Sequence, residues 1–150
     1  LDRVLGMDPY DFEQFCGQLL RVMGFRDVEV TEKSGDGGID GYGRLKVGIV
    51  TVNAAFQCKR NQPGNNIGRP IVDGVRGATM GLYEQAIIVT TASFTKGARE
   101  SSIRAGAIPV VLVDGNELVD LMIRNEMGVA THAFKMPIID EDFFNPNDEA

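Results

Sequence analysis

The order of helix and strand patterns is the feature that most restricts the folds open to this chain. One helical pattern is followed by three strand patterns with no helix between them, and after these the helix and strand patterns alternate. Consecutive strands joined by short connections pair antiparallel, whereas a strand-helix-strand unit places its two strands parallel. The sequence therefore predicts an α/β domain with a mixed central sheet and helices on both sides.

An apolar spacing of 3.6 residues predicts the first helix, directly after Asp8. Asp8 is of a residue type that caps helix N-termini, and Gly24 stands where the helix should end. The side chains that share the apolar face are those of Phe12, Phe15, Cys16, Leu19, Leu20 and Met23. The segment is thus predicted to be an amphipathic helix.

The remaining elements are predicted from alternation, capping residues and turn residues. The predicted strands cover residues 28–30, 39–44, 47–58, 86–91 and 108–113. The predicted helices cover residues 70–80, 95–105 and 116–123. Pro70 suits the first turn of its helix, and Thr95 suits an N-cap.

A length of 150 residues suits one domain with one sizeable core. We expect residues 1–136 to form this domain and residues 137–150 to form an acidic, irregular tail. No apolar run approaches the roughly 18 residues of a membrane span. Two cysteines are too few for a disulfide scaffold, so the default interpretation is a reduced, cytoplasmic domain. Because the sequence opens at Leu1, we also expect a fragment of a longer protein.

The distribution of charge leaves nucleic-acid binding open, although the net charge of −6 is at first sight unfavourable. Residues 44–104 carry a net charge of +6, between segments of −5 and −7. A locally basic surface can hold phosphates on an acidic chain, because salt screens charges beyond about 10 Å. A solvated surface of mixed charge is the alternative, and charge alone does not decide between the two.

Polar side chains gather at the end of the long predicted strand. Gln57 and Lys59 are two residues apart, so both point to one face of the strand while Cys58 points to the other. Asp40 follows a glycine-dense turn and can lie beside them on a neighbouring strand. A carboxylate and an amide oxygen suit a divalent cation, and a lysine can orient water and offset phosphate charge. The set therefore indicates phosphodiester hydrolysis.

These residues belong to an ordered set that resembles the Mrr-like restriction endonuclease catalytic domain, a member of the PD-(D/E)xK nuclease superfamily. The resemblance covers roughly residues 8–121. Its specific parts are the Gly-Asp-Gly-Gly-Ile-Asp block that ends at Asp40 and the Gln-Cys-Lys-Arg block at residues 57–60. Its other parts are Phe12-Glu13, Gly24-Phe25 and residues 89–95. The resemblance implies a restriction-endonuclease-like three-layer α/β/α sandwich.

The resemblance also implies a role for each matching residue. Asp40 matches the metal-binding aspartate, and Gln57 stands where the wider superfamily has an acidic residue. Lys59 matches the lysine, Glu13 matches the glutamate of the first helix, and the carbonyl of Cys58 is a further implied metal ligand. The implied cofactor is Mg²⁺, for which Mn²⁺ can substitute. Because Gln57 brings no charge, we hypothesise that Glu13 supplies the missing carboxylate.

The function implied by the resemblance is a Mg²⁺-dependent, type II/IV-like restriction endodeoxyribonuclease that cuts foreign or modified double-stranded DNA. A separate DNA-recognition domain outside this sequence is implied as well. Cutting both strands needs two sites, so we expect a homodimer or a higher homo-oligomer. Two alternatives stay open: a related repair or junction-processing nuclease, and a catalytically inactive DNA-binding module of the same fold.

The principal site residues also have structural interpretations. Asp40 is alternatively a turn aspartate, Glu13 a charge favoured by the helix dipole, and Lys59 a surface lysine. Asp36 is interpreted as a loop-shaping residue rather than a ligand. The glycine cluster lacks the spacing of a calcium loop and the order of a dinucleotide-binding turn.

Outside the principal site, three charged residues and two cysteines receive structural interpretations. Arg69, Asp73 and Arg76 share one face of their predicted helix, where we favour an ion-pair ladder over a phosphate-tracking surface. Cys16 and Cys58 are predicted to be buried apolar fillers.

Overall fold

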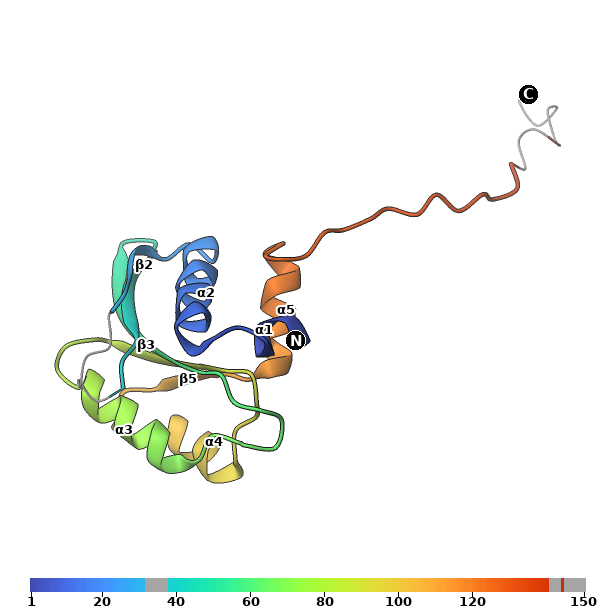
Figure 1. Ribbon diagram of the computed structural model, residues 1–150. Helices are drawn as coiled ribbons and strands as arrows, with labels where there is room; N and C mark the ends of the chain where they lie inside the picture. Colours follow the sequence, from blue (N-terminus) through green and yellow to red (C-terminus); the bar gives the residue numbers. More distant parts are fainter. Residues whose placement is uncertain (32–37, 141–143, 145–150) are drawn as a thin grey trace.

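The computed structural model describes residues 1–31, 38–140 and 144 (Figure 1). The strands of its sheet are β1 (Arg26–Val30), β2 (Gly41–Val47), β3 (Val50–Lys59), β4 (Gln85–Thr90) and β5 (Val110–Val113). The helices in the described ranges are α1 (Asp2–Leu5), α2 (Pro9–Val22), α3 (Arg69–Thr79), α4 (Lys96–Ser102) and α5 (Gly115–Arg124). In those ranges, no helix is long and apolar enough to cross a membrane.

The sheet is mixed, as the order of the sequence patterns predicts. The strands follow one another in space in the order β1-β2-β3-β4-β5. β1, β2 and β3 pair antiparallel, whereas β3, β4 and β5 pair parallel. The two parallel connections pass through α3 and α4, because a parallel neighbour can be reached only by a crossover. β3 is thus the strand at which the sheet changes from antiparallel to parallel pairing.

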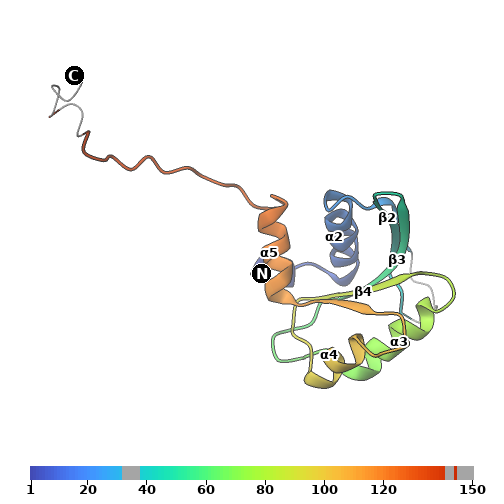
Figure 2. The same cartoon turned by 180° about the vertical axis from the view of Figure 1, so that it is seen from behind.

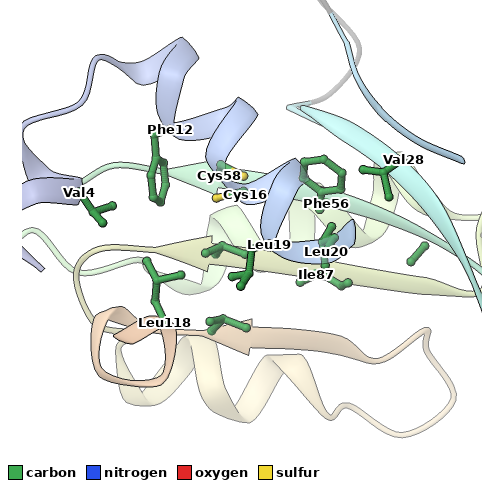
Figure 3. Close-up of a cluster of buried hydrophobic side chains, with 13 residues drawn as sticks. Val4, Phe12, Cys16, Leu19, Leu20, Val28, Phe56, Cys58, Ile87 and Leu118 are labelled. Carbon is green, nitrogen blue, oxygen red and sulfur yellow. The ribbon is translucent and has the colours of Figure 1, made fainter. Parts of the chain in front are cut away.

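Helices cover both faces of the sheet, which confirms the three-layer α/β/α sandwich (Figures 1 and 2). On one face α2 packs against the strands, and its Phe12, Cys16 and Leu19 meet Phe56 and Cys58 of β3 (Figure 3). On the other face α3 and α4 close a second apolar cluster. That cluster contains Ile67, Val72, Val75, Ala86, Ile88, Phe94, Ala98 and Val110.

The predicted caps are confirmed at two helices. The Asp8 carboxylate accepts the N–H of Asp11 at 2.8 Å, and the Thr95 hydroxyl accepts the N–H of Ala98 at 3.2 Å. α4 nevertheless ends at Ser102, earlier than the predicted end at residue 105. Its Ser102 hydroxyl donates to the carbonyl of Arg99 at 2.7 Å, a local bond of the kind that competes with continuation of a helix.

Two further segments lie at the ends of the described chain. The sequence analysis missed α1, a four-residue helix that is too short to show a period and is held by the buried side chain of Val4. After α5, residues 129–140 form neither helix nor strand and lead away from the body (Figure 1). Most of the acidic, irregular tail predicted for residues 137–150 lies outside the described residues, so the tail and the domain boundary at residue 136 stay predictions.

Two glycines allow the packing of β2 to be tested with one and the same substitution. A Cβ added at Gly41 would lie 2.3 Å from the Phe56 ring and 2.4 Å from the Glu29 carbonyl oxygen, whereas one added at Gly77 in α3 meets nothing within 4 Å. We expect Gly41→Ala to lower the free energy of unfolding by about 1–3 kcal/mol. Gly77→Ala should raise it by up to about 1 kcal/mol. Urea denaturation measures both, and equal effects would contradict this packing.

Candidate active site

Asp40 lies directly before β2, where its side chain takes the place of a rung in the β2–β3 ladder. Its backbone N–H donates to the carbonyl of Phe56 at 2.9 Å. Its carboxylate oxygen Oδ2 accepts the N–H of Cys58 at 2.7 Å. Because the N–H and C=O groups of a strand residue point to the same side, the Cys58 carbonyl also faces the strand position of Asp40. A carboxylate and a backbone carbonyl therefore meet at this end of the strand pair.

Gln57 and Lys59 lie on the face of β3 opposite Cys58. The thiol of Cys58 is packed against α2 beside Cys16 (Figure 3). Strand alternation therefore turns Gln57 and Lys59 toward the other face. Gln57 is 4% exposed, and in the described part of the chain its Oε1 has no hydrogen-bond partner. Buried polar atoms are almost always satisfied, so this oxygen can accept a further ligand as far as the described residues show.

The backbone of Gly38 holds the Gln57 amide in place. A Cβ added at Gly38 would lie 2.2 Å from Nε2 of Gln57, and Gly38 itself has a φ of +86°. A side chain at this position would therefore be excluded twice, by the positive φ and by the amide. Gly38 is the last glycine of the glycine-dense turn, and its contact with the Gln57 amide explains why a glycine is needed there. Asp36 and the rest of that turn lie outside the described residues.

Lys59 is half-buried at the end of β3, and its backbone is fixed from β4. Its carbonyl accepts the Thr90 hydroxyl at 2.7 Å and the Thr91 N–H at 3.3 Å. Burial raises the pKa of the Asp40 carboxyl above its usual range, although the N–H of Cys58 and the positive charge of Lys59 act in the opposite direction. Lys59 therefore lies close enough to Asp40 for the two charges to interact.

Glu13 approaches the same segment from α2, where it is half-buried. Burial, contact with the Cys16 thiol, and the negative charges of Asp40 and Glu13 together raise the pKa of the Cys58 thiol. The carboxylates of Asp40 and Glu13 thus both lie close enough to Cys58 to raise the pKa of its thiol. Glu13 lies on the α2 side, whereas Gln57 and Lys59 lie on the other side of the sheet.

The oxygen atoms gathered here fit a hard divalent cation. The Asp40 carboxylate, the Gln57 Oε1 and the Cys58 carbonyl are the oxygen types that Mg²⁺ prefers. Among the described residues, no group of three or more His, Cys, Asp or Glu residues is placed to hold a metal ion. The donors that fit therefore include an amide oxygen and a backbone carbonyl, and the ligand roles stay a prediction.

Comparison with known proteins identifies the family. Residues 4–122 match the family model of the Mrr catalytic domain, which is described as a restriction endonuclease. The chain belongs to the Mrr restriction endonuclease family. It is 37% identical to the type IV methyl-directed restriction enzyme EcoKMrr of Escherichia coli strain K12, in a match that covers 96% of this chain. The chain spans 47% of the length of that relative.

Solved structures of restriction endonucleases share the fold of this Mrr family member. The DNA modification-dependent restriction endonuclease AspBHI superposes with a TM-score of 0.70 at 27% identity, over 85% of this chain and 34% of its own. The restriction endonuclease MspJI, in complex with a 27-mer oligonucleotide, gives a TM-score of 0.64 at 28% identity. The match covers 78% of this chain and 28% of the MspJI chain. The chain is therefore a restriction endonuclease catalytic domain homologous to modification-dependent enzymes.

The structural interpretations made outside the principal site are confirmed. On α3, Asp73 pairs with Arg69 and with Arg76, each at 3.0 Å, which is the predicted ion-pair ladder. The expectation that the ladder lies on the surface is wrong for Arg76, which is buried. The ladder also holds α4, because the Ser101 hydroxyl donates to Asp73 at 2.5 Å. Cys16 and Cys58 are both buried.

Two anchors near the site were missed by the sequence analysis. Arg60, the last residue of the Gln-Cys-Lys-Arg block, donates to the carbonyl of Leu5 at 2.9 Å and so ties the end of β3 to the end of α1. The Thr90 hydroxyl donates to the Lys59 carbonyl and fixes it, although Thr90 is part of no polar motif in the sequence. A threonine pair at the end of a buried strand is the signal that could have found this second anchor.

The pKa shifts of two aspartates predict stability changes of opposite sign. Burial raises the pKa of Asp40, so in the absence of metal its ionised form destabilises the fold above that pKa. Asp40→Asn should therefore raise the melting temperature near pH 7, and the difference should shrink as the pH falls through the pKa. The Ser101 hydroxyl and Arg69 lower the pKa of Asp73, so its stabilisation is present at neutral pH and lost in acid.

Asp73→Asn is accordingly the matched control and should lower the melting temperature at pH 7. Thermal denaturation of both variants between pH 3 and 8, in buffer with a metal chelator, measures the two trends. If Asp40→Asn destabilised the fold as Asp73→Asn does, the burial cost inferred for Asp40 would be wrong.

Proposed function

We propose that this chain is the cleavage domain of a modification-dependent restriction enzyme that hydrolyses phosphodiester bonds of double-stranded DNA in the cytoplasm. The observation that carries the proposal is the hydrogen bond from the N–H of Cys58 to the Asp40 carboxylate. It places Asp40 at the strand segment that also bears Gln57 and Lys59, the two neighbours of Cys58. A desolvated carboxylate, an amide oxygen with no hydrogen-bond partner among the described residues, and an ammonium group are chemical groups that can support phosphoryl transfer.

In the proposed site, Asp40, Gln57, the Cys58 carbonyl and Glu13 would hold Mg²⁺, with Mn²⁺ as a substitute. When bound, the cation polarises the phosphate and stabilises the negative charge that develops on it. The Cys58 N–H fixes the orientation of Asp40, at 2.7 Å from Oδ2. The Oε1 of Gln57, which has no hydrogen-bond partner within residues 1–31, 38–140 and 144, supports the assignment of Gln57 as a neutral ligand.

Lys59 is proposed to position the attacking water and to offset the charge of the phosphate. Its backbone is fixed by Thr90, so little of the chain has to reorganise before the reaction. Its ammonium already interacts with Asp40, which favours a position between the carboxylate and the substrate.

The substrate and the assembly are proposed from the charge distribution and the relatives. The segment of net charge +6, residues 44–104, contains Lys59 and supplies cations for the DNA backbone. The relative EcoKMrr is methyl-directed and about twice as long as the matched part, so a separate recognition domain would select modified DNA. Two copies would act together, because a duplex has two strands to cut.

Plasmid nicking tests the proposal. The wild-type chain should nick supercoiled plasmid in Mg²⁺ or Mn²⁺ and not in a chelator. Asp40→Ala should abolish cutting, because the metal loses its carboxylate. Lys59→Ala should slow cutting by about 10²-fold or more, the usual cost of losing a preorganised charge in the transition state. The exposed Lys135→Ala, in the irregular segment after α5 and outside residues 44–104, is the matched lysine control and should cut at the wild-type rate.

Both methylated and unmethylated plasmid are used, and DNA binding is measured in parallel. Retained binding in Asp40→Ala and Lys59→Ala would separate loss of chemistry from loss of affinity. A wild-type chain that bound DNA and cut neither plasmid with either metal would contradict the nuclease and favour a DNA-binding module.

Gln57→Glu tests whether residue 57 is a metal ligand, because this substitution should strengthen the binding of Mg²⁺. A carboxylate at this position adds a negative charge beside Asp40, so half-maximal nicking should require several-fold less Mg²⁺ than in the wild type. Gln57→Leu removes the oxygen and should require more. Titration of the nicking rate with Mg²⁺ measures both, and an unchanged requirement in the two variants would exclude Gln57 as a ligand.

A further inference from the structure

Three hydrogen bonds lead from the start of α5 to the backbone of Lys59. The N–H of Gly115 donates to the carbonyl of Ala92 at 2.9 Å, and the N–H of Ala92 donates to the Thr90 hydroxyl at 3.2 Å. The Thr90 hydroxyl donates in turn to the Lys59 carbonyl at 2.7 Å. These three bonds, called the threonine relay below, connect α5, the end of β4 and the end of β3.

The Thr90 hydroxyl is the closest of the donors that the described residues bring to the Lys59 carbonyl. The N–H groups of Asn61 and Thr91 donate to the same oxygen at 3.0 Å and 3.3 Å. The side chain of Thr90 is fully buried, and a valine would have the same shape with no polar atom to satisfy. A threonine at this position is therefore explained by the two bonds of its hydroxyl, both of which belong to the relay.

The backbone is also fixed on either side of Lys59. The Thr91 hydroxyl, which is buried as well, donates to the carbonyl of Asn61 at 2.7 Å. On the preceding side, the Asp40 carboxylate accepts the N–H of Cys58. The end of β3 is thus held from β4 and from the start of β2, and the Cα of Lys59 has little freedom to move.

Gly115 brings the backbone of α5 directly against the end of β4. A Cβ added at Gly115 would lie 2.6 Å from the carbonyl oxygen of Thr91 and 3.1 Å from its carbonyl carbon. A close-packed backbone transmits such a displacement to its neighbours. Because the N–H and the hydroxyl of Thr91 bond the carbonyls of Lys59 and Asn61, a larger residue at position 115 would shift the segment that carries Lys59.

We propose that Thr90 and Gly115 are positioning residues for Lys59. They set the place of the Lys59 ammonium relative to Asp40 and act through it on the reaction. An ammonium that orients water is effective only when its position is fixed beforehand, and a misplacement of about 1 Å can cost about 100-fold in rate. The inference rests on the proposed function, because it takes Lys59 to act in the reaction.

The rate at which the whole chain nicks supercoiled plasmid in Mg²⁺ tests the role of Thr90. Thr90→Val removes the hydroxyl and leaves the Lys59 carbonyl two backbone donors, so the variant should fold. Its maximal rate should fall between about 10-fold and 100-fold at an unchanged KM for plasmid. Thr90→Ser keeps the hydroxyl and should restore most of the rate.

Thr79→Val is the matched control for the loss of a buried hydroxyl. Thr79 is as buried as Thr90, and its hydroxyl donates to the carbonyl of Arg76 at 2.9 Å, within α3. This variant should nick at the wild-type rate. Thermal melts establish that each variant is folded at the assay temperature.

Gly115→Ala tests the other end of the relay. It should lower the maximal rate about tenfold, because the added Cβ displaces Thr91 and with it the end of β3. Gly77→Ala is its control, since a Cβ added there meets nothing within 4 Å, and it should nick at the wild-type rate.

Combination with Lys59→Ala separates positioning of the lysine from a general structural effect. If the relay acts through Lys59, Thr90→Val should slow the Lys59→Ala chain by less than about twofold, because the group that it positions is gone. Rate losses that multiply, or a Thr90→Val chain that nicks as fast as the wild type, would overturn the inference and leave the proposed nuclease intact. A wild type that does not nick, or a Lys59→Ala chain that nicks normally, would contradict the proposed function, and the inference would fail with it.

Discussion

The hydrogen bond from the N–H of Cys58 to the carboxylate of Asp40 is the interaction on which the candidate site depends. It stands where a rung of the antiparallel ladder would stand, since β2 begins one residue later at Gly41. One bond thus ends the ladder and fixes a carboxylate in the plane of the sheet. Strand alternation along β3 turns Gln57 and Lys59, the neighbours of Cys58, to the opposite face.

This arrangement is possible only because the surrounding chain is unusually compact. The Gln57 amide rests on Gly38, and Gly41 lies against the Phe56 ring. The same compactness excludes water from Asp40 and raises its pKa. In the proposed site, a bound cation would offset the cost of ionising this carboxylate. The raised pKa of Asp40 is therefore a consequence of the packing around it.

The sequence predicted the features that local rules control. The cap at Asp8, the opposite faces of Gln57 and Cys58, and the change from antiparallel to parallel pairing all follow from spacing along the chain. The contacts that join distant residues were not predictable in this way. The bond from Arg60 to Leu5 spans 55 residues, and the bond from Thr90 to Lys59 spans 31. The early end of α4 depends on a serine side chain whose competing bond no periodicity reveals.

The neutral side chain at position 57 is consistent with the cost of burying charge. Gln57 is 4% exposed, so a glutamate there would be desolvated beside Asp40, and each carboxylate would raise the pKa of the other. An amide supplies an oxygen ligand without that repulsion. The second negative charge of the proposed site then comes from Glu13, which is only half-buried and reaches the segment from the opposite face. Because Glu13 approaches from the α2 side, the two carboxylates of the proposed site need not be buried side by side, and the repulsion between them is smaller than it would be with a glutamate at position 57.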